Sequence, residues 1–142
     1  MRLPILFAFM VSQLLLAPAA HADREADFKQ GMGLYDQRNY VGAYTPLVKA
    51  AKAGHAKAAF NIGVMFETKK IEVKADSQPD YDQAVYWYDQ AARKGHATGQ
   101  YRIGLFYMKG RGIAQNKQSA LYWFNQSAAQ NYQPAIAIKA FL

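Results

Sequence analysis

The feature that most constrains the fold is an internal repeat. Residues 40–66 align with residues 81–107 without a gap, and nine of the paired positions are identical, among them His55/His96 and Gly63/Gly104. A further shift of 36 residues aligns residues 84–92 with residues 120–128. Periods of this length are typical of stacked units that are each too small to bury an apolar face alone. We therefore expect a row of similar units that bury one another.

Each unit is predicted to be a pair of helices. Between residues 81 and 93, apolar or small side chains occupy positions 81, 84, 85, 88, 91 and 92, which is the stripe of an amphipathic helix. Asp80 and Asn116 stand where a short polar side chain can cap a helix start. Gly54, Gly95 and Asn131 follow Ala-rich segments, where a helix end favours a left-handed residue. The expected helices cover residues 24–37, 40–53, 56–68, 81–93, 97–108, 117–129 and 134–142.

Two glycines fall inside predicted helices. Gly63 and Gly104 occupy the same place in two units, and a glycine in a helix interior costs about 1 kcal/mol relative to alanine. Close approach of a neighbouring helix is the usual compensation. No stretch alternates apolar and polar residues long enough to predict a strand.

The first 22 residues are predicted to be a cleaved signal peptide. Arg2 gives a positive start, residues 3–16 are almost entirely apolar, and Ala20-His21-Ala22 fits a small-residue cleavage site. Pro4, Gln13 and Pro18 interrupt the apolar run, which argues against a membrane-spanning helix or a stable membrane anchor. We expect residues 23–142 to form a single domain that is periplasmic or secreted.

Charge is distributed unevenly along residues 23–142, which carry 16 basic and 10 acidic side chains. Residues 23–82 hold nine of each, whereas residues 83–142 hold seven basic residues against the single acid Asp89. Such asymmetry is typical of proteins that bind acidic partners, nucleic acids or membrane headgroups. Export argues against nucleic acid, and a basic face that only aids solubility is an equal alternative.

At this point the residues resemble a known family, the Sel-one-like repeat (SLR) proteins, which are relatives of the tetratricopeptide repeat. The matching positions of the last unit are Tyr107, Gly110, Gly112, Ile113, Asn116, Ala120, Trp123, Phe124, Ala128 and Asn131. The preceding half of the motif is Gly95, His96, Ala97, Ile103 and Gly104, and residues 28–47 are similar to the opening unit of many members. The second unit departs from the pattern, with Lys69 and Ile71 where glycine is expected and a longer connector at residues 69–79.

The resemblance implies an all-α fold. We expect an α-solenoid of about three helix-turn-helix repeats, at residues 24–53, 56–93 and 97–129, with a terminal helix at 134–142. The array should coil as a right-handed superhelix whose concave face is lined by the first helix of each pair.

Catalytic and metal-binding patterns are not apparent. His55 and His96 recur with the repeat, so we assign them a structural role, and the chain has no cysteine. Ser119 and Ser127 have no base at a suitable spacing. The loop Gly110-Arg111-Gly112 lacks the strand and lysine of a phosphate loop. Capping and solvation account for the acids near residues 76–82. We predict no enzyme activity and no cofactor.

The surface left for function is the exposed side of the first helices. The matched aromatics Trp87, Tyr88, Trp123 and Phe124 are predicted to form the core between repeats. With Ala59, Ile62, Gly63 and Phe66 also in the core, the positions facing the groove are Lys57, Phe60, Asn61 and Val64, followed by Thr98, Tyr101, Arg102 and Leu105. Aromatic and cationic groups together suit a peptide or protein with apolar and acidic side chains.

The C-terminal segment suggests a second surface. Residues 134–142 are apolar nearly all round, with Lys139 the only charge. The helix either folds back on the third pair or associates with another protein or a second copy of the chain, through Ile136, Ile138, Phe141 and Leu142.

These patterns predict an exported, non-catalytic module that binds a protein or peptide through its concave face. Two alternatives stay open from the sequence. One is an immunity-type protein that neutralises a periplasmic toxin, and the other is a peptidoglycan-binding or cell-wall-active protein.

Overall fold

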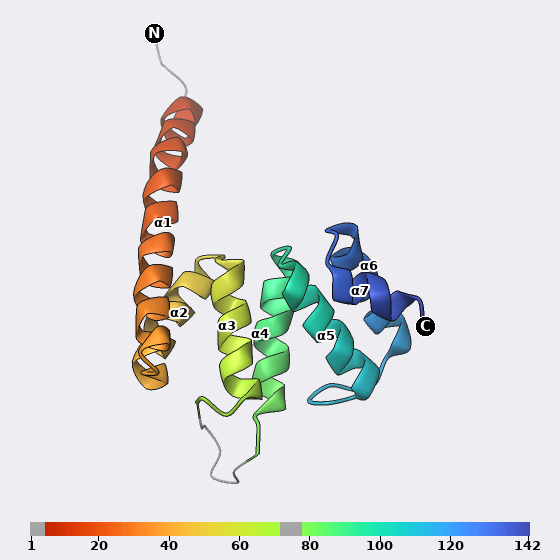
Figure 1. Ribbon diagram of the computed structural model, residues 1–142. Coiled ribbons are helices and arrows are strands. Elements are labelled where there is room, and N and C mark those ends of the chain that lie inside the picture. The colour runs from red at the N-terminus through yellow and green to blue at the C-terminus, as the bar shows by residue number, and fades with distance from the viewer. Residues whose placement is uncertain (1–4, 72–77) are drawn as a thin grey trace.

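The computed structural model describes the backbone of residues 5–71 and 78–142, and the side chains of residues 19–71 and 78–142. In these ranges the chain forms seven helices and no strand. They are α1 (Ile5–Asp36), α2 (Tyr40–Lys52), α3 (Ala56–Glu67), α4 (Tyr81–Arg93), α5 (Ala97–Lys109), α6 (Lys117–Ala129) and α7 (Gln133–Lys139). The helices follow one another in space in chain order, so the protein is an α-solenoid, as the repeat predicts (Figure 1).

Helix bounds agree with the sequence to within one or two residues, except at the two ends of the chain. The first helix begins at Ile5 instead of residue 24, because residues 19–26 are rich in alanine and contain no glycine or proline to stop a helix. The last helix ends at Lys139 instead of residue 142, since the final turn of a terminal helix has no following residues to complete its hydrogen bonds.

The predicted helix ends are confirmed. The side chains of Asp80 and Asn116 accept hydrogen bonds from the amides of Gln83 and Ser119, at 3.1 and 2.9 Å. Gly54, Gly95 and Asn131 all have positive φ, at 89°, 85° and 62°.

The unusual residue Lys69 adopts the backbone conformation of the glycine that it replaces. Its φ of 57° matches the 66° of Gly110, which lies 41 residues later. The turn geometry is therefore kept where the sequence departs from the repeat. Most of the predicted longer connector, residues 72–77, lies outside the described residues.

Each helix pair closes around a glycine of its first helix. A Cβ atom on Gly63 would lie 2.7 Å from the ring of Tyr88, and one on Gly104 would lie 2.6 Å from the ring of Phe124. In the first pair a Cβ on Gly31 would lie 2.6 Å from Leu47. These distances are too short for any real Cβ contact, so the second helix of each pair can approach only because the first helix has a hydrogen at this position. The expected close approach is confirmed.

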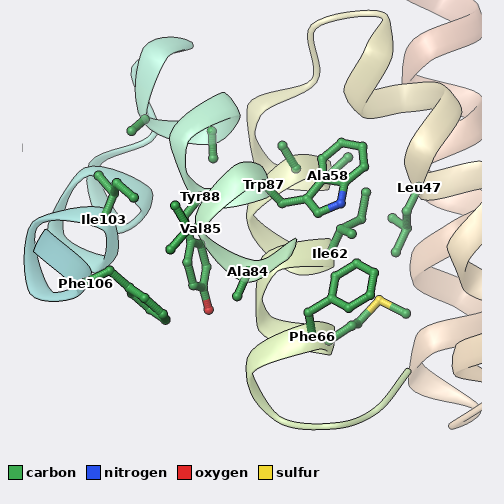
Figure 2. Close-up of a cluster of buried hydrophobic side chains, with 14 of the residues drawn as sticks. Leu47, Ala58, Ile62, Phe66, Ala84, Val85, Trp87, Tyr88, Ile103 and Phe106 are labelled. Atoms are coloured by element: carbon green, nitrogen blue, oxygen red, sulfur yellow. The ribbon is translucent and has the colours of Figure 1, made fainter. Parts of the chain in front are cut away.

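The matched aromatic side chains form the core between the helices. Tyr88 and Phe124 are fully buried, and Trp87 and Trp123 are 6% and 9% exposed. The core continues from Leu47 through Ile62 and Phe66 to Ile103 and Phe106 (Figure 2). The positions assigned to the core of α3, which are Ala59, Ile62, Gly63 and Phe66, are all buried.

Replacing Gly63 by alanine should destabilise the protein. Glycine to alanine inside a helix normally stabilises, but here the new methyl group must displace the Tyr88 ring, and overpacking of a core costs about 1–3 kcal/mol. Gly33 is the matched control, since it is a helical glycine with nothing within 4 Å of an added Cβ. Chemical denaturation should show Gly63→Ala less stable and Gly33→Ala more stable, the latter by about 0.5–1 kcal/mol. A stabilised Gly63→Ala variant would contradict this packing.

Candidate functional site

The predicted groove residues lie on one side of α3 and α5. Seven of the eight are half-buried and Lys57 is exposed, while the positions between them point into the core. We call this surface the α3–α5 face. It consists of Lys57, Phe60, Asn61, Val64, Thr98, Tyr101, Arg102 and Leu105. All eight are at least partly accessible, and their role in binding stays a prediction.

Two aromatic residues of the α3–α5 face also hold neighbouring units together. The ring of Phe60 stacks on His96 with 4.7 Å between centroids, and Tyr101 lies 5.4 Å from Tyr132. In the first unit Phe28 stacks in the same way on His55, at 4.0 Å. Each of these aromatics belongs to the first helix of a pair. Each contacts the residue just before the first helix of the following unit, which is His55, His96 or Tyr132. Phe60 and Tyr101 therefore offer a partner only the part of each ring that this stacking leaves uncovered.

The two recurring histidines cap helices, which confirms their structural assignment. Nδ1 of His55 accepts a hydrogen bond from the amide of Ala58 at 3.2 Å, and Nδ1 of His96 accepts from the amide of Gly99 at 3.0 Å. Burial lowers the pKa of both imidazoles, and Lys57 lowers that of His96 further. Both rings line one pocket, but among the described residues no group of three or more histidines and acids could hold a metal ion.

Arg102 of the α3–α5 face is engaged within the protein. Its Nη1 lies 3.3 Å from Oε1 of Glu67 on α3, and the second carboxylate oxygen of Glu67 accepts a hydrogen bond from the hydroxyl of Tyr88 at 2.5 Å. Burial and the neighbouring carboxylate raise the pKa of Tyr88 far above its usual value. This pairing could not be predicted from the sequence, because Glu67, Tyr88 and Arg102 follow no repeat spacing. Arg102 can still meet a partner, since its side chain is 39% exposed.

Helix α1, the first helix of the first pair, contacts the α3–α5 face through residues that the sequence analysis did not name. Nδ2 of Asn61 lies 3.1 Å from Sδ of Met32, and Nζ of Lys57 lies 5.9 Å from the centre of the Phe28 ring. A 32-residue offset that pairs Phe28 with Phe60 and Gly31 with Gly63 is the sequence signal that could have found this contribution.

Two further polar residues that the sequence singled out, Ser127 and Asp80, have structural roles. The hydroxyl of Ser127 is buried and donates to the carbonyl of Ala97 at 2.8 Å. Asp80 caps α4, and Asp76 lies outside the described residues.

The C-terminal segment both packs on the array and exposes apolar side chains. Ala135 of α7 is fully buried, so the helix does lie against its neighbour α6. Ile136 and Leu142 are each 42% exposed, Phe141 is 87% exposed and Ile138 is half-buried. Association of this surface with another molecule stays a prediction.

Comparison with known proteins places two copies of one family motif on this framework. The family model of the Sel1 repeat matches residues 56–96 and 97–132. In the part of the chain that the structure describes, no helix has the length and apolar content needed to cross a bilayer.

Solved structures with the same fold cover most of the chain. A Sel1 repeat protein from Oxalobacter formigenes has a TM-score of 0.74 at 24% identity, covering 92% of this chain and 98% of that one. A protective antigen with an SLR fold, present in uropathogenic Escherichia coli strains, has a TM-score of 0.62 at 28% identity, covering 83% of this chain and 25% of that one. Helicobacter pylori cysteine rich protein B has a TM-score of 0.67 at 19% identity, covering 87% and 93%.

Curated relatives share only a segment with this chain. The DAP3-binding cell death enhancer 1 of Rattus norvegicus is 31% identical over 93 residues, which are 66% of this chain and 17% of that protein. The chitin synthase regulatory factor 4 of Schizosaccharomyces pombe is 33% identical over 63 residues, which are 44% of this chain and 8% of that protein. The chain thus spans less than a fifth of the length of the curated relatives it matches.

The stability of the protein should fall as the pH drops through the ordinary pKa of histidine. Because burial lowers the pKa of His96 in the folded state, the unfolded chain binds the proton more readily, and the full stability is present only above about pH 6.5. Protonation also removes the acceptor that caps α5. His96→Asn keeps a capping side chain without a titrating ring, so its loss of unfolding free energy between pH 7 and 5 should be smaller by about 1 kcal/mol. Urea denaturation at both pH values measures this, with Lys52→Gln as a control, and an unchanged loss in His96→Asn would contradict it.

Proposed function

Because the chain belongs to the Sel1 repeat family, whose members generally mediate protein–protein interactions, we propose that it is a non-catalytic module that holds a protein or peptide on the α3–α5 face. The observation that carries this proposal is the composition of that face. It presents an aromatic and an aliphatic side chain in matched positions on each of two successive first helices, and each of these helices adds one cation, Lys57 on α3 and Arg102 on α5. Such a mixture is typical of surfaces that bind peptides and proteins.

The face also offers aliphatic side chains to a partner. Val64 and Leu105 occupy equivalent positions of α3 and α5, and both are half-buried. Partly exposed aliphatic side chains in a row can be covered by an extended segment or a helix of another protein, which removes their remaining apolar surface from water.

Charge favours a partner with acidic groups. The only acid among residues 83–142 is Asp89, and its carboxylate accepts a hydrogen bond from Nε of Arg93 at 2.6 Å. Arg102 pairs with Glu67 of α3, but the other cations of this half outnumber its acids, so the half carries a net positive charge that attracts acidic segments.

We further propose that the chain is exported and cleaved after Ala22. The first half of α1 extends beyond the other helices (Figure 1), and Nη1 of Arg24, just past the expected cleavage point, hydrogen-bonds to the carbonyl of Ala53 at 3.4 Å. Removal of residues 1–22 would leave this bond and the packing of Gly31 on Leu47 in place. The Sel1 repeats themselves start at residue 56, so they do not depend on the leader.

The face can be tested by placing negative charges on it. Val64→Asp combined with Leu105→Asp should weaken capture of the partner from an envelope extract by about tenfold, which corresponds to roughly 1.4 kcal/mol. Tyr122→Asp is the control, since Tyr122 is 55% exposed on α6, away from the α3–α5 face. Quantitative mass spectrometry of the captured proteins measures the effect, and circular dichroism verifies folding. Equal retention by all three chains would contradict a role for this face.

The leader can be tested by mass. The chain recovered from the producing cell should begin at Asp23, and Ala22→Phe should block cleavage because the site requires small residues. Ala26→Phe is the control, since it introduces the same ring outside the cleavage site and should leave processing unchanged. Intact mass spectrometry reports both results. A wild-type chain that keeps its first 22 residues would contradict the export proposal.

A further inference from the structure

The first unit contains a carboxylate–histidine pair that is absent from the second. Oε2 of Glu25 lies 3.3 Å from Nε2 of His55, whose ring stacks on Phe28. Because Nδ1 of His55 accepts from the amide of Ala58, the neutral ring carries its hydrogen on Nε2 and donates it to Glu25. The carboxylate therefore completes the hydrogen bonding of the imidazole.

In the second unit a lysine stands where this carboxylate would be. His96 stacks on Phe60 and accepts from the amide of Gly99, as His55 does in its own unit. Glu25 lies three residues before Phe28, and the residue three before Phe60 is Lys57. Within the described residues, Nε2 of His96 has no acceptor at hydrogen-bonding distance, and the nearby Lys57 is a second donor.

These two donors line an open pocket with an excess of positive charge. The pocket has a volume of about 380 Å³, and its walls include His55, Lys57 and His96 together with Arg24, Glu25 and Lys94. Its one carboxylate already pairs with His55. His21, which also lines the pocket, belongs to the segment that we propose is removed.

Two of these cations converge without an anion between them. Nη1 of Arg24 and Nζ of Lys94 lie 3.6 and 3.9 Å from the point that a Cβ atom on Gly54 would occupy. In addition, Nε of Arg24 is buried and has no hydrogen-bond partner. Several cations around one pocket repel one another, and an anion bound in the pocket reduces that repulsion.

From this arrangement we propose that a carboxylate of the partner binds between Lys57 and His96, in the place that Glu25 occupies beside His55. The proposal rests on the proposed function, because Lys57 also belongs to the α3–α5 face. The Nε2–H of His96 and the ammonium group of Lys57 donate to the two carboxylate oxygens, and Lys94 and Arg24 add their charge from the pocket wall. The ligand is an aspartate or glutamate side chain, or the free carboxyl end of a chain, held by charge-assisted hydrogen bonds.

Three short peptides distinguish these sources in an NMR titration of the chain as recovered from the producing cell. The first is Gly-Glu-Gly blocked at both ends, the second is blocked Gly-Gln-Gly, and the third is triglycine blocked only at its amino end. The glutamate peptide should shift the ring signals of His96 and raise the pKa of its imidazole. Burial, Lys57 and His55 lower this pKa in the free protein, and a bound carboxylate opposes them by stabilising the protonated ring. An effect of triglycine instead would assign the site to a chain end.

Charge reversal at the pocket supplies the decisive comparison. Lys57→Glu should rebuild the pair of the first unit, so that the pKa of His96 rises without peptide and the glutamate peptide binds at least about tenfold more weakly. Lys117→Glu makes the same change of charge at an exposed position of α6 and should bind as the wild type. Equal binding of the glutamate and glutamine peptides, or wild-type binding by Lys57→Glu, would overturn the site.

The test separates this site from the proposed function. Suppose that Lys57→Glu abolishes binding of the glutamate peptide, while the double variant Val64→Asp with Leu105→Asp still captures the partner. This result would support the pocket as a carboxylate site and would exclude the α3–α5 face as the partner-binding surface. If partner capture instead requires Val64 and Leu105 but is unchanged in Lys57→Glu, the α3–α5 face is supported as the partner-binding surface and the pocket is excluded as the carboxylate site.

Discussion

The contact on which the array depends is the one between a glycine of the first helix and a bulky side chain of the second helix in each pair. Gly63 meets Tyr88 and Gly104 meets Phe124, and in both cases a methyl group would leave no room. The chain has no cysteine, so no disulfide stabilises the array and close packing of the helices must contribute in its place. Glycine in a helix is unfavourable by itself, so its position here shows that the gain in packing exceeds that local cost.

This contact also determines which residues are left for function. Once the glycine side of α3 faces α4, the residues one position to either side are Ile62, which is buried, and Val64, which is half-buried. The packing of the core therefore determines which residues of each first helix are exposed. Stacking of Phe60 on His96 adds a second restraint, since it ties that exposed side to the start of the next first helix. The same residues thus serve both the array and the surface that it presents.

The fold could be predicted from the sequence because its determinants recur at a fixed spacing. Caps such as Asp80 and Asn116, the left-handed ends of the helices and the buried aromatics all follow local rules that act within one unit. The site was predicted less completely. The phase of α3 and α5 separated their buried positions from their partly exposed ones. The pairing of Arg102 with Glu67, in contrast, joins residues of different helices at no regular spacing, and only three-dimensional packing brings them together. The start of α1 was also predicted wrongly, because an expected cleavage point is not a point at which a helix must stop.

Repeats of this kind separate the positions that build the fold from those that can vary. Three residues before the stacked aromatic, the first helices carry Glu25, Lys57 and Thr98 in turn, whereas the aromatic itself is kept as Phe28, Phe60 and Tyr101. The aromatic packs against the next unit in all three cases, whereas the residue one turn earlier is at least partly exposed and differs in each helix, with only Glu25 hydrogen-bonded to the histidine of the next unit. A charge at that position alters the electrostatics of the neighbouring cap residue without disturbing the core, as the different surroundings of His55 and His96 illustrate. A solenoid can therefore change its specificity one unit at a time, and the unit in which the internal carboxylate is replaced by a lysine is the one best suited to accept a carboxylate from outside.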